Sequence, residues 1–344
     1  MSIEGIQIIK AKEQWGALLS EIEQFDFYHT FDYHQLSKQP NEQPILIKYQ
    51  KGNSIIGLPL LLRRIYETEY YDITSVYGYV GSIHKNIDKD FDKDLFQTQL
   101  KKYFKEQNIV SLFSRLNPYI DFQENVLSGL GDIIALGDVV NIDITNSIEV
   151  SRSNYSKSTK SRVNKARKQC YVKSIASDAD INIFVDIYYE NMKRLNAKDS
   201  YFFDRDYFFN FYKSSDFETE ILLVYDSETD LAIAGSMFVK TNQIIQFHLS
   251  GTRDAYLNIA PARVFLDEMR LIGTEDGFRY FNLGGGLGAE RDSLFEFKSS
   301  FSKDFKSFKV WKYIVNKKAY IDLSNQFSNS EKNQDYFPLY RNGL

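Results

Sequence analysis

The sequence is poor in cysteine, histidine and proline, and it has no long apolar run. Its 344 residues include one cysteine, four histidines and six prolines. The single cysteine, Cys170, excludes an intrachain disulfide and a cysteine-based zinc site, and no two histidines have His-x-x-x-His spacing. The longest apolar run, Ile55–Leu62, contains a glycine and a proline, and it is far shorter than the roughly 20 residues of a membrane span. We therefore expect neither a metal site nor a membrane span.

The chain as a whole also lacks an excess of charge of one sign. Its 42 basic and 46 acidic residues give a net charge of −4, which does not indicate a nucleic acid or an anionic membrane as partner of the whole protein. The N-terminal stretch has neither the basic region nor the apolar region of a signal peptide. We therefore expect a cytoplasmic protein.

Apolar and aromatic residues, in contrast, are plentiful. Hydrophobic residues make up 43% of the chain, with 24 tyrosines and 27 phenylalanines, which predicts large cores or an aromatic-lined cleft. Domains usually contain about 100–200 residues, so this length favours two of them.

Two β-hairpin patterns echo each other along the chain. Ile45–Tyr49 and Ile55–Leu62 are apolar runs separated by a polar turn, and so are Ile221–Tyr225 and Ile233–Val239. The two patterns start 221 − 45 = 176 residues apart. A repeat of this length indicates duplicated domains, because solenoid repeats have periods of about 20–50 residues.

Helical and strand patterns alternate in both halves, which predicts an α/β (α+β) fold with mixed sheets. We expect one domain over 1–150, a second over 151–325, and a polar, loosely held C-terminal tail over 326–344. The patterns predict helices over 13–22, 92–107, 178–196 and 260–272, and strands over 69–80, 109–114, 243–250, 278–283 and 307–315.

A basic segment opens the second half. Between Arg152 and Lys173 there are eight basic residues and no acidic one. Such a segment is compatible with a solvated helix face, or with an anion site for a phosphate, a pyrophosphate or an RNA end. The second interpretation has support because like charges on one helix repel each other at i, i+4, and a polyanionic ligand would relieve that repulsion. The candidate phosphate-binding residues in the segment are Lys160, Arg162, Lys165 and Arg167.

A glycine cluster follows the predicted strand at 278–283. Gly284, Gly285 and Gly286 form neither a G-x-G-x-x-G dinucleotide fingerprint nor a P-loop. Glycines here either allow a strand end with positive φ or bring backbone N–H groups close to an oxyanion.

The residues after this cluster carry a resemblance to a known family. The motif Leu-x-x-Phe-Lys-x-x-Phe, from Leu294 to Phe301, resembles the FemAB-like branch of the GNAT acyltransferase superfamily. Lys160–Lys168 resembles the basic helix of that family, and Tyr188–Arg194 resembles its following helix. The resemblance implies two tandem GNAT-like (acyl-CoA N-acyltransferase-like) domains, of which the first is structural or acceptor-binding and the second carries the catalytic site.

The resemblance also implies an activity, acyl transfer to an amine. Lys298 would stabilise the oxyanion of the tetrahedral intermediate beside the aromatic wall of Phe297, and a fixed cation at that position is worth several kcal/mol. The donor would be aminoacyl-tRNA or acyl-CoA. The acceptor would be a cell-envelope saccharide, a nucleotide-sugar or a peptidoglycan precursor.

The sequence departs from the family in ways that bear on both substrates. Peptidoglycan-precursor enzymes carry a Pro-Arg-Gly-Pro-like stretch in the first unit, whereas this chain has Tyr77-Gly-Tyr79 there, so a peptidoglycan acceptor is less favoured. Tyr77 and Tyr79 are candidates to contact a sugar ring. For a CoA donor, Arg253 is present but the paired glycines that hold a pyrophosphate are missing. Arg194 is a further candidate to bind a phosphate, although the helix dipole alone favours an arginine there.

These observations predict an acyl- or aminoacyltransferase that acts on an amino group of a cell-envelope precursor. One alternative is an acyl-CoA-dependent N-acetyltransferase of surface-polysaccharide biosynthesis. Another is a non-catalytic tandem GNAT module that binds RNA or another ligand. His248 could serve as a base for the amine, although a buried strand histidine is the more common role.

Overall fold

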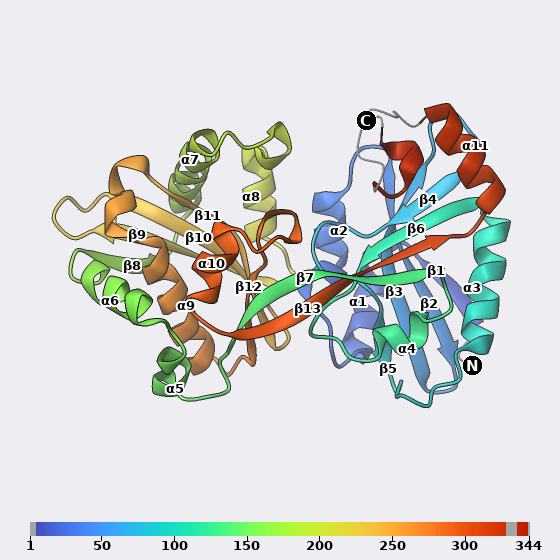
Figure 1. Ribbon diagram of the computed structural model, residues 1–344, viewed down its shortest axis with the longest axis horizontal. Coiled ribbons are helices and arrows are strands. Elements are labelled where there is room, and N and C mark those ends of the chain that lie inside the picture. The colour runs from blue at the N-terminus through green and yellow to red at the C-terminus, as the bar shows by residue number, and fades with distance from the viewer. Residues whose placement is uncertain (1–4, 328–335, 343–344) are drawn as a thin grey trace. The chain divides into compact units, whose positions relative to one another are not determined.

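The computed structural model describes residues 5–327 and 336–342. By its internal contacts the chain divides into two compact units (Figure 1). Unit 1 consists of Met1–Leu136 and Ser307–Leu344, and unit 2 of Gly137–Lys306. Each unit is a mixed α/β structure built on its own run of paired strands, which confirms the predicted fold class.

In unit 1, a mixed sheet has the strand order β1-β2-β3-β4-β6-β13, and β5 pairs with β3. β4 and β6 are parallel, and the other pairs are antiparallel. The strands are β1 (Gly5–Ile9), β2 (Glu42–Lys51), β3 (Ser54–Arg64), β4 (Tyr71–Thr74), β5 (Ile83–Lys85), β6 (Ile109–Arg115) and β13 (Asp304–Ile314). The helices are α1 (Lys12–Glu21), α2 (Phe31–Ser37), α3 (Asp94–Glu106), α4 (Gln123–Leu127) and α11 (Lys317–Phe327), with short 3-10 turns η1 (Phe27–His29) and η5 (Leu339–Arg341).

Both faces of this sheet are buried, which explains the continuous apolar runs in β2 and β3. Successive side chains of a strand point to opposite faces. Ile45 and Ile47 of β2 accordingly pack in the core that contains Phe96 of α3, whereas Leu46 packs in the core that contains Trp15 of α1. Helices α1 and α3 therefore cover opposite faces of the same strands.

In unit 2, the strand order is β7-β12-β11-β10-β9-β8. β11 and β12 are parallel, and the other pairs are antiparallel. Helices α7 and α8 lie on one face of β10 and β11, and α6 and α9 lie on the other (Figure 1). The strands are β7 (Asp132–Asp143), β8 (Cys170–Ser174), β9 (Glu218–Asp226), β10 (Ala232–Thr241), β11 (Ile244–Thr252) and β12 (Tyr280–Gly284). The helices are α5 (Ile148–Ser153), α6 (Lys157–Ala166), α7 (Asp178–Arg194), α8 (Arg205–Tyr212), α9 (Ala262–Glu275) and α10 (Ser293–Ser299), with 3-10 turns η2 (Asp199–Tyr201), η3 (Asp254–Ile259) and η4 (Leu287–Ala289).

The two units share one order of elements and one pattern of strand pairing. In each, a first strand is followed by helices, by three consecutive antiparallel strands, and by a helix that leads to a parallel strand. The repeated hairpins are β2–β3 and β9–β10. The final strand of each copy is exchanged: the second part of β7 pairs with β12 of unit 2, and the second part of β13 pairs with β6 of unit 1.

A glycine at matching positions lets a helix pack closely on each hairpin. A Cβ at Gly57 of β3 would lie 2.9 Å from the Ile83 side chain and 3.4 Å from Leu18 of α1. A Cβ at Gly235 of β10 would lie 2.8 Å from Phe184 of α7. The two hairpins that resemble each other in sequence thus both need a glycine where a helix packs against them.

The strand exchange explains why the boundaries of the two observed units, at 136/137 and 306/307, differ from the expected domain boundaries at 150/151 and 325/326. The observed boundaries fall inside β7 and β13, because each of these strands begins with one unit and ends in the other. A boundary inside a regular strand leaves no linker signal in the sequence. The identity of each half as a GNAT-like domain with its own role stays a prediction.

Part of the expected C-terminal tail is firmly packed on unit 1. Tyr340 is fully buried, and its carbonyl accepts a hydrogen bond of 2.8 Å from Tyr66 Oη. Arg341 Nε lies 2.8 Å from Asp72 Oδ2. The expectation of a loosely held tail is therefore wrong for these residues, while 328–335 and 343–344 lie outside the described residues.

Most predicted elements match observed ones to within three residues at each end. The strand expected over 69–80 is an exception, since β4 ends at Thr74. The chain turns after it, with Gly78 at φ 111° and Gly81 at φ 72°. A Cβ at Gly78 would lie only 2.1 Å from an atom of the Tyr28 ring.

Within the described ranges, no helix combines the length and the apolar character that a membrane span requires.

Candidate active site

Lys298 is a buried cation on the short helix α10. Its exposed fraction is 7%, and Nζ donates a hydrogen bond of 2.7 Å to the carbonyl oxygen of Gly285. The helix is fixed at its start by Asp292, whose carboxylate accepts a hydrogen bond of 2.9 Å from Phe295 N. The lysine predicted from the sequence motif therefore points at the predicted glycine bend.

The glycines are needed at this bend because the backbone passes close to other atoms. Gly284 ends β12 with φ 76°, and a Cβ there would lie 3.2 Å from Lys298 Nζ. A Cβ at Gly285 would lie 2.8 Å from the Asp138 carbonyl, and one at Gly286 would lie 2.1 Å from the Glu290 carbonyl. Positive φ is thus the requirement at Gly284, and close backbone approach is the requirement at the other two positions.

A pair of buried side-chain amides forms hydrogen bonds that fix the glycine bend. Asn282 Nδ2 of β12 donates a hydrogen bond of 2.8 Å to Gln246 Oε1 of β11, and Asn282 Oδ1 accepts one of 2.9 Å from Gly284 N. Both side chains are almost completely buried. The contacts therefore connect β11, the bend and, through Gly285, the ammonium group of Lys298.

β11 and β12 separate at this amide pair. Their parallel register ends at Gln246 and Asn282, whereas β11 continues beside β10 to Thr252. The side chains from Phe247 to Ser250 are half-exposed, although β11 is an inner strand. Lys298 Nζ lies 5.8 Å from the centre of the Phe247 ring, so the lysine stands next to the part of β11 that β12 leaves uncovered.

The electrostatics of Lys298 suit a group that stabilises negative charge. Burial lowers the pKa of its ammonium to about 8, and the Asp292 carboxylate opposes this effect. The group is therefore still largely protonated at pH 7. Across the described ranges, no carboxylate lies within 4 Å of its Nζ. A cation without an acidic partner, held by a neutral carbonyl, is available to an oxyanion.

Phe297 faces a different environment from its neighbour Lys298. Its ring lies 5.6 Å from the Phe301 ring in an edge-to-face arrangement. The guanidinium of Arg263, at the start of α9, lies 4.8 Å from its centre. Phe297 thus contacts a second cation, Arg263, that the sequence did not single out.

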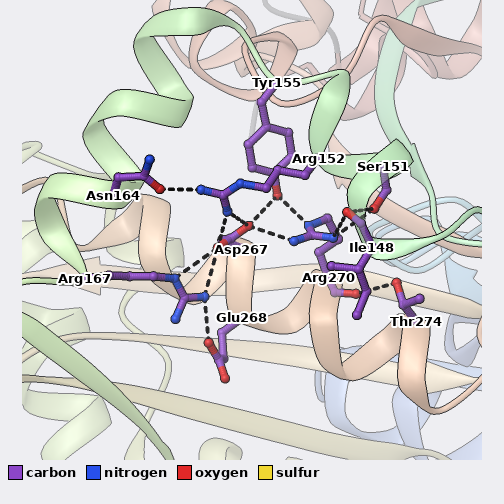
Figure 2. A network of polar contacts seen from close by, with 10 residues as sticks. All are labelled: Ile148, Ser151, Arg152, Tyr155, Asn164, Arg167, Asp267, Glu268, Arg270 and Thr274. Carbon is purple, nitrogen blue, oxygen red and sulfur yellow. Dashed lines mark hydrogen bonds and ion pairs between the residues drawn. The ribbon is translucent and has the colours of Figure 1, made fainter.

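The basic segment is partly neutralised by acids from another helix. Asp267 of α9 is 1% exposed and accepts hydrogen bonds from three arginines: Arg152 at 3.1 Å, Arg167 at 2.9 Å and Arg270 at 3.1 Å (Figure 2). Arg167 also lies 2.7 Å from Glu268. Burial opposes ionisation of Asp267, but the arginines hold the pKa of its carboxyl below the ordinary value. The charge repulsion inferred within the segment is therefore relieved by α9 at Arg152 and Arg167.

The other predicted residues of the segment have different surroundings. Lys160 Nζ donates a hydrogen bond of 2.8 Å to the Ser153 carbonyl. Arg162 and Lys165 are exposed on α6, and neither forms an ion pair with a described residue. These three cations are available for binding, whereas Arg167 is committed to an internal network.

Arg194 and Arg253 lie together at the end of α7, and each is paired with an acid. Arg194 Nε is 3.0 Å from Asp254, and Arg253 Nη1 is 2.8 Å from Glu190. The Glu190 carboxylate also accepts a hydrogen bond from Asp254 N at 2.9 Å. The four groups form a compact, charge-balanced link between α7 and the loop after β11.

The two candidate tyrosines lie in unit 1. Tyr77 is 69% exposed, with the Arg115 guanidinium 5.7 Å from its ring centre. Tyr79 is half-buried between Tyr28, at 5.9 Å, and Phe308, at 5.2 Å. Tyr77 is therefore exposed, whereas Tyr79 is packed between two aromatic rings.

His248 of β11 stacks on an aromatic side chain. Its ring lies 4.9 Å from Phe211 at an angle of 18°, and its Nε2 is 3.3 Å from Tyr207 Oη. Burial lowers the pKa of His248 to about 3, so the imidazole is neutral at pH 7.

Several residues of the site were not found by sequence reasoning. Asn282 and Gln246 are polar residues inside apolar strand patterns, and that interruption is the signal that could have marked them. Arg263 and Asp267 gave no comparable signal, because their partners lie on other helices.

In the part of the chain that the structure covers, no group of three or more His, Cys, Asp or Glu residues is arranged to hold a metal ion.

No family model and no curated protein sequence matches this chain. Solved structures do match. FemX has a TM-score of 0.70 and 13% identity, with 92% of this chain and 99% of FemX covered. A conserved protein of unknown function from Bacteroides thetaiotaomicron has a TM-score of 0.59 and 10% identity, with 90% and 99% covered. The C-terminal domain of a protein named as a lysylphosphatidylglycerol synthetase from Agrobacterium fabrum has a TM-score of 0.56 and 11% identity, with 92% and 96% covered. This chain therefore has the fold of FemX, and the resemblance to the FemAB-like branch is confirmed at the level of the fold.

Proposed function

We propose that this protein is an acyl- or aminoacyltransferase that forms an amide on an amino group of a cell-envelope precursor in the cytoplasm. The observation that carries the proposal is Lys298, a buried ammonium group without an acidic partner among the described residues, held at a glycine bend beside the uncovered part of β11. The FemX-like fold supports it. One relative is named for lysylphosphatidylglycerol, an aminoacylated lipid, and that name also connects this fold with aminoacyl transfer.

The reaction needs no covalent enzyme intermediate. The acceptor amine attacks the carbonyl carbon of the donor ester or thioester, a C–N bond forms, and the carbonyl oxygen takes up the negative charge. Lys298 donates a hydrogen bond to that oxygen and lowers the energy of the charged intermediate. The intermediate then collapses, the bond from carbon to the leaving oxygen or sulfur breaks, and the proton lost by the amine neutralises the leaving group.

The start of α9 favours an ester donor such as aminoacyl-tRNA over acyl-CoA. A pyrophosphate at a helix N-terminus requires backbone N–H groups that are free to bind it. Here Arg263 N donates to the Ala260 carbonyl at 3.1 Å, and Val264 N donates to the Pro261 carbonyl at 2.9 Å. Arg253, the one residue of the CoA-binding pattern that this chain has, forms an ion pair with Glu190.

Unit 1 is the proposed acceptor-binding part. Tyr77 offers an exposed ring to a sugar, and Arg115 beside it offers a cation to an anionic group of a saccharide or nucleotide-sugar. Lys160, Arg162 and Lys165 on α6 are proposed to contact phosphate groups of the donor or acceptor.

A transfer assay with a panel of donors tests the proposal. The purified full chain is incubated with aminoacylated RNA minihelices or with acetyl-CoA, each with amino-sugar nucleotides, and products are identified by mass spectrometry. The proposal predicts a new amide from the RNA ester donors. An amide formed only from acetyl-CoA would identify the N-acetyltransferase alternative. RNA binding without any amide product would contradict catalysis and favour the binding module.

A further inference from the structure

Arg263 carries a charge that no described residue balances. It lies in the first turn of α9 and is half-buried. Its Nη1 donates hydrogen bonds to Thr159 Oγ1 at 3.0 Å and to Ser300 Oγ at 3.1 Å. Both acceptors are neutral hydroxyl groups. Nε and Nη2 have no hydrogen-bond partner among the described residues, so part of the guanidinium remains available to a ligand.

The charges around Arg263 make its position unfavourable without a ligand. Burial, and then the positive charge of Arg162, lower the pKa of the Arg263 guanidinium. Over the ranges that the structure describes, no carboxylate lies within 4 Å of it. Arg152, Arg167 and Arg270 of the same unit instead share Asp267. A half-buried cation beside a like charge costs free energy unless an anion binds.

The neutral groups around Arg263 orient it. Thr159 Oγ1 donates a hydrogen bond of 2.8 Å to Ser300 Oγ, and Ser300 Oγ donates one of 2.6 Å to the Phe297 carbonyl. The guanidinium carbon lies 4.8 Å from the centre of the Phe297 ring. A guanidinium that is held in a fixed orientation and keeps N–H groups without a partner is well suited to bind phosphate oxygens.

We propose that Arg263 and Arg162, with the Arg263 side chain oriented by the hydroxyls of Thr159 and Ser300, form a binding site for a phosphate group of a substrate. The proposal rests on the proposed function and adds a site to it. It moves the centre of phosphate binding in the basic region from Arg167, which pairs with Asp267, to Arg263. Because Arg263 lies against the Phe297 ring, the phosphate would bind on the side of α10 that Phe297 faces.

Binding measurements with three phosphate-bearing probes test this site. Uridine diphosphate, coenzyme A and a short single-stranded RNA represent the acceptor, a thioester donor and an ester donor. Titration calorimetry at low salt is expected to give saturable binding of at least one probe to the wild-type chain. Arg263→Gln, which keeps a hydrogen-bond donor but loses the charge, is expected to weaken that binding at least tenfold. The probe that responds identifies the source of the phosphate.

Matched variants separate a specific effect from a general one. Arg162→Gln removes an exposed cation, so it is expected to fold normally and to weaken the same probe several-fold. Arg263→Lys keeps the charge and should recover part of the affinity. Arg205→Gln removes an arginine that pairs with Asp186 on α7, and it should bind every probe as the wild type does.

The proposal is overturned if no probe binds the wild-type chain at millimolar concentration. It is equally overturned if a probe binds Arg263→Gln and Arg162→Gln within about twofold of the wild type. The readout is binding, so it is independent of transfer. Loss of binding in these variants, together with no amide product from any donor, would contradict the proposed function and leave this site standing.

Discussion

Lys298, predicted to be catalytic, and Arg167, predicted to bind phosphate, are both cations, but their surroundings differ. Lys298 is almost fully buried, yet its hydrogen-bond acceptor is a neutral carbonyl. The Arg167 guanidinium, in contrast, forms ion pairs with Asp267 and Glu268. A cation that lacks an acidic partner costs stability, and proteins retain such groups chiefly at functional sites.

The titration of Lys298 is the first prediction at this scale. Its pKa is about 8 in the folded protein, against 10.5 for an ordinary lysine. Between these values the unfolded chain binds more protons than the folded one, so the free energy of unfolding rises with pH from about 8 to 10.5. At pH 7 the buried charge destabilises the fold, and Lys298→Met is expected to raise the free energy of unfolding by about 1–3 kcal/mol.

Urea unfolding at pH 7 and pH 10.5 measures this difference between the wild type and Lys298→Met. The rate at which Lys298 reacts with an amine-directed reagent, followed by mass spectrometry, gives its pKa directly. A labelling midpoint near 10.5, with equal stability of the two proteins, would show that Lys298 is an ordinary lysine.

At the scale of single residues, the sequence motif singled out Lys298 and the glycine bend, and the structure places the two in contact. The motif could not reveal Gln246, which lies 36 positions before its partner Asn282, nor the contact between Arg263 and Phe297. Neither contact follows from local spacing, because each depends on where strands and helices meet in the fold.

At the scale of elements, α9 organises unit 2 through Asp267. Removing this carboxylate would leave Arg152, Arg167 and Arg270 crowded without a counter-charge. Loss of one partner from a buried ion pair typically costs about 3–5 kcal/mol, so Asp267→Asn is expected to lower the free energy of unfolding by roughly that amount.

Urea denaturation compares Asp267→Asn with Glu268→Gln. Glu268 pairs with Arg167 but is 29% exposed, and exposed pairs contribute about 0–1 kcal/mol. Equal losses in the two variants would contradict a structural role centred on Asp267.

A second prediction at this scale concerns the amides where β11 and β12 separate. Asn282→Ala removes the hydrogen bonds that Asn282 forms with Gln246 Oε1 and with Gly284 N, at a cost of about 1–3 kcal/mol. The Gly285 carbonyl is then less well held, so the labelling midpoint of Lys298 should also change. Gln243→Ala, at an exposed amide in the turn before β11, should change neither stability nor labelling. An unchanged Lys298 midpoint in folded Asn282→Ala would show that the amide pair does not position the lysine.

At the same scale, local periodicity predicted the strongly patterned helices and strands well. The 178–196 pattern corresponds to α7 over Asp178–Arg194, and the 109–114 pattern to β6 over Ile109–Arg115. Elements whose stability comes from contacts between distant segments were not predicted: α10 and β7, for example, show no sufficient pattern of their own.

At the scale of the whole molecule, the exchange of β7 and β13 determines how the chain folds. Unit 1 needs β13, because Trp311 is fully buried in its core and its Nε1 donates a hydrogen bond to the Leu130 carbonyl. The half-length echo predicted two related domains, but exchange of the last strand changes no local residue pattern and could not be read from the sequence.

Chain fragments test this exchange. Unit 2 is one continuous segment, so 137–306 is expected to unfold cooperatively in urea, as followed by circular dichroism. The fragment 1–136 should not fold, because its β6 edge and the Trp311 position are empty. Joining 1–136 to 307–344 by a flexible linker should restore folding. A cooperative transition of 1–136 alone would contradict the need for β13.

The most direct measurement of the central claim is the initial rate of amide formation by Lys298→Met, with whichever donor proves active. Removal of one oxyanion donor typically lowers kcat by about 10²–10³-fold, and this loss is expected at unchanged folding. Lys303→Met, which removes an exposed lysine five residues away, should retain the wild-type rate. A Lys298→Met rate within about twofold of the wild type would contradict the assignment of Lys298 as the group that stabilises the oxyanion.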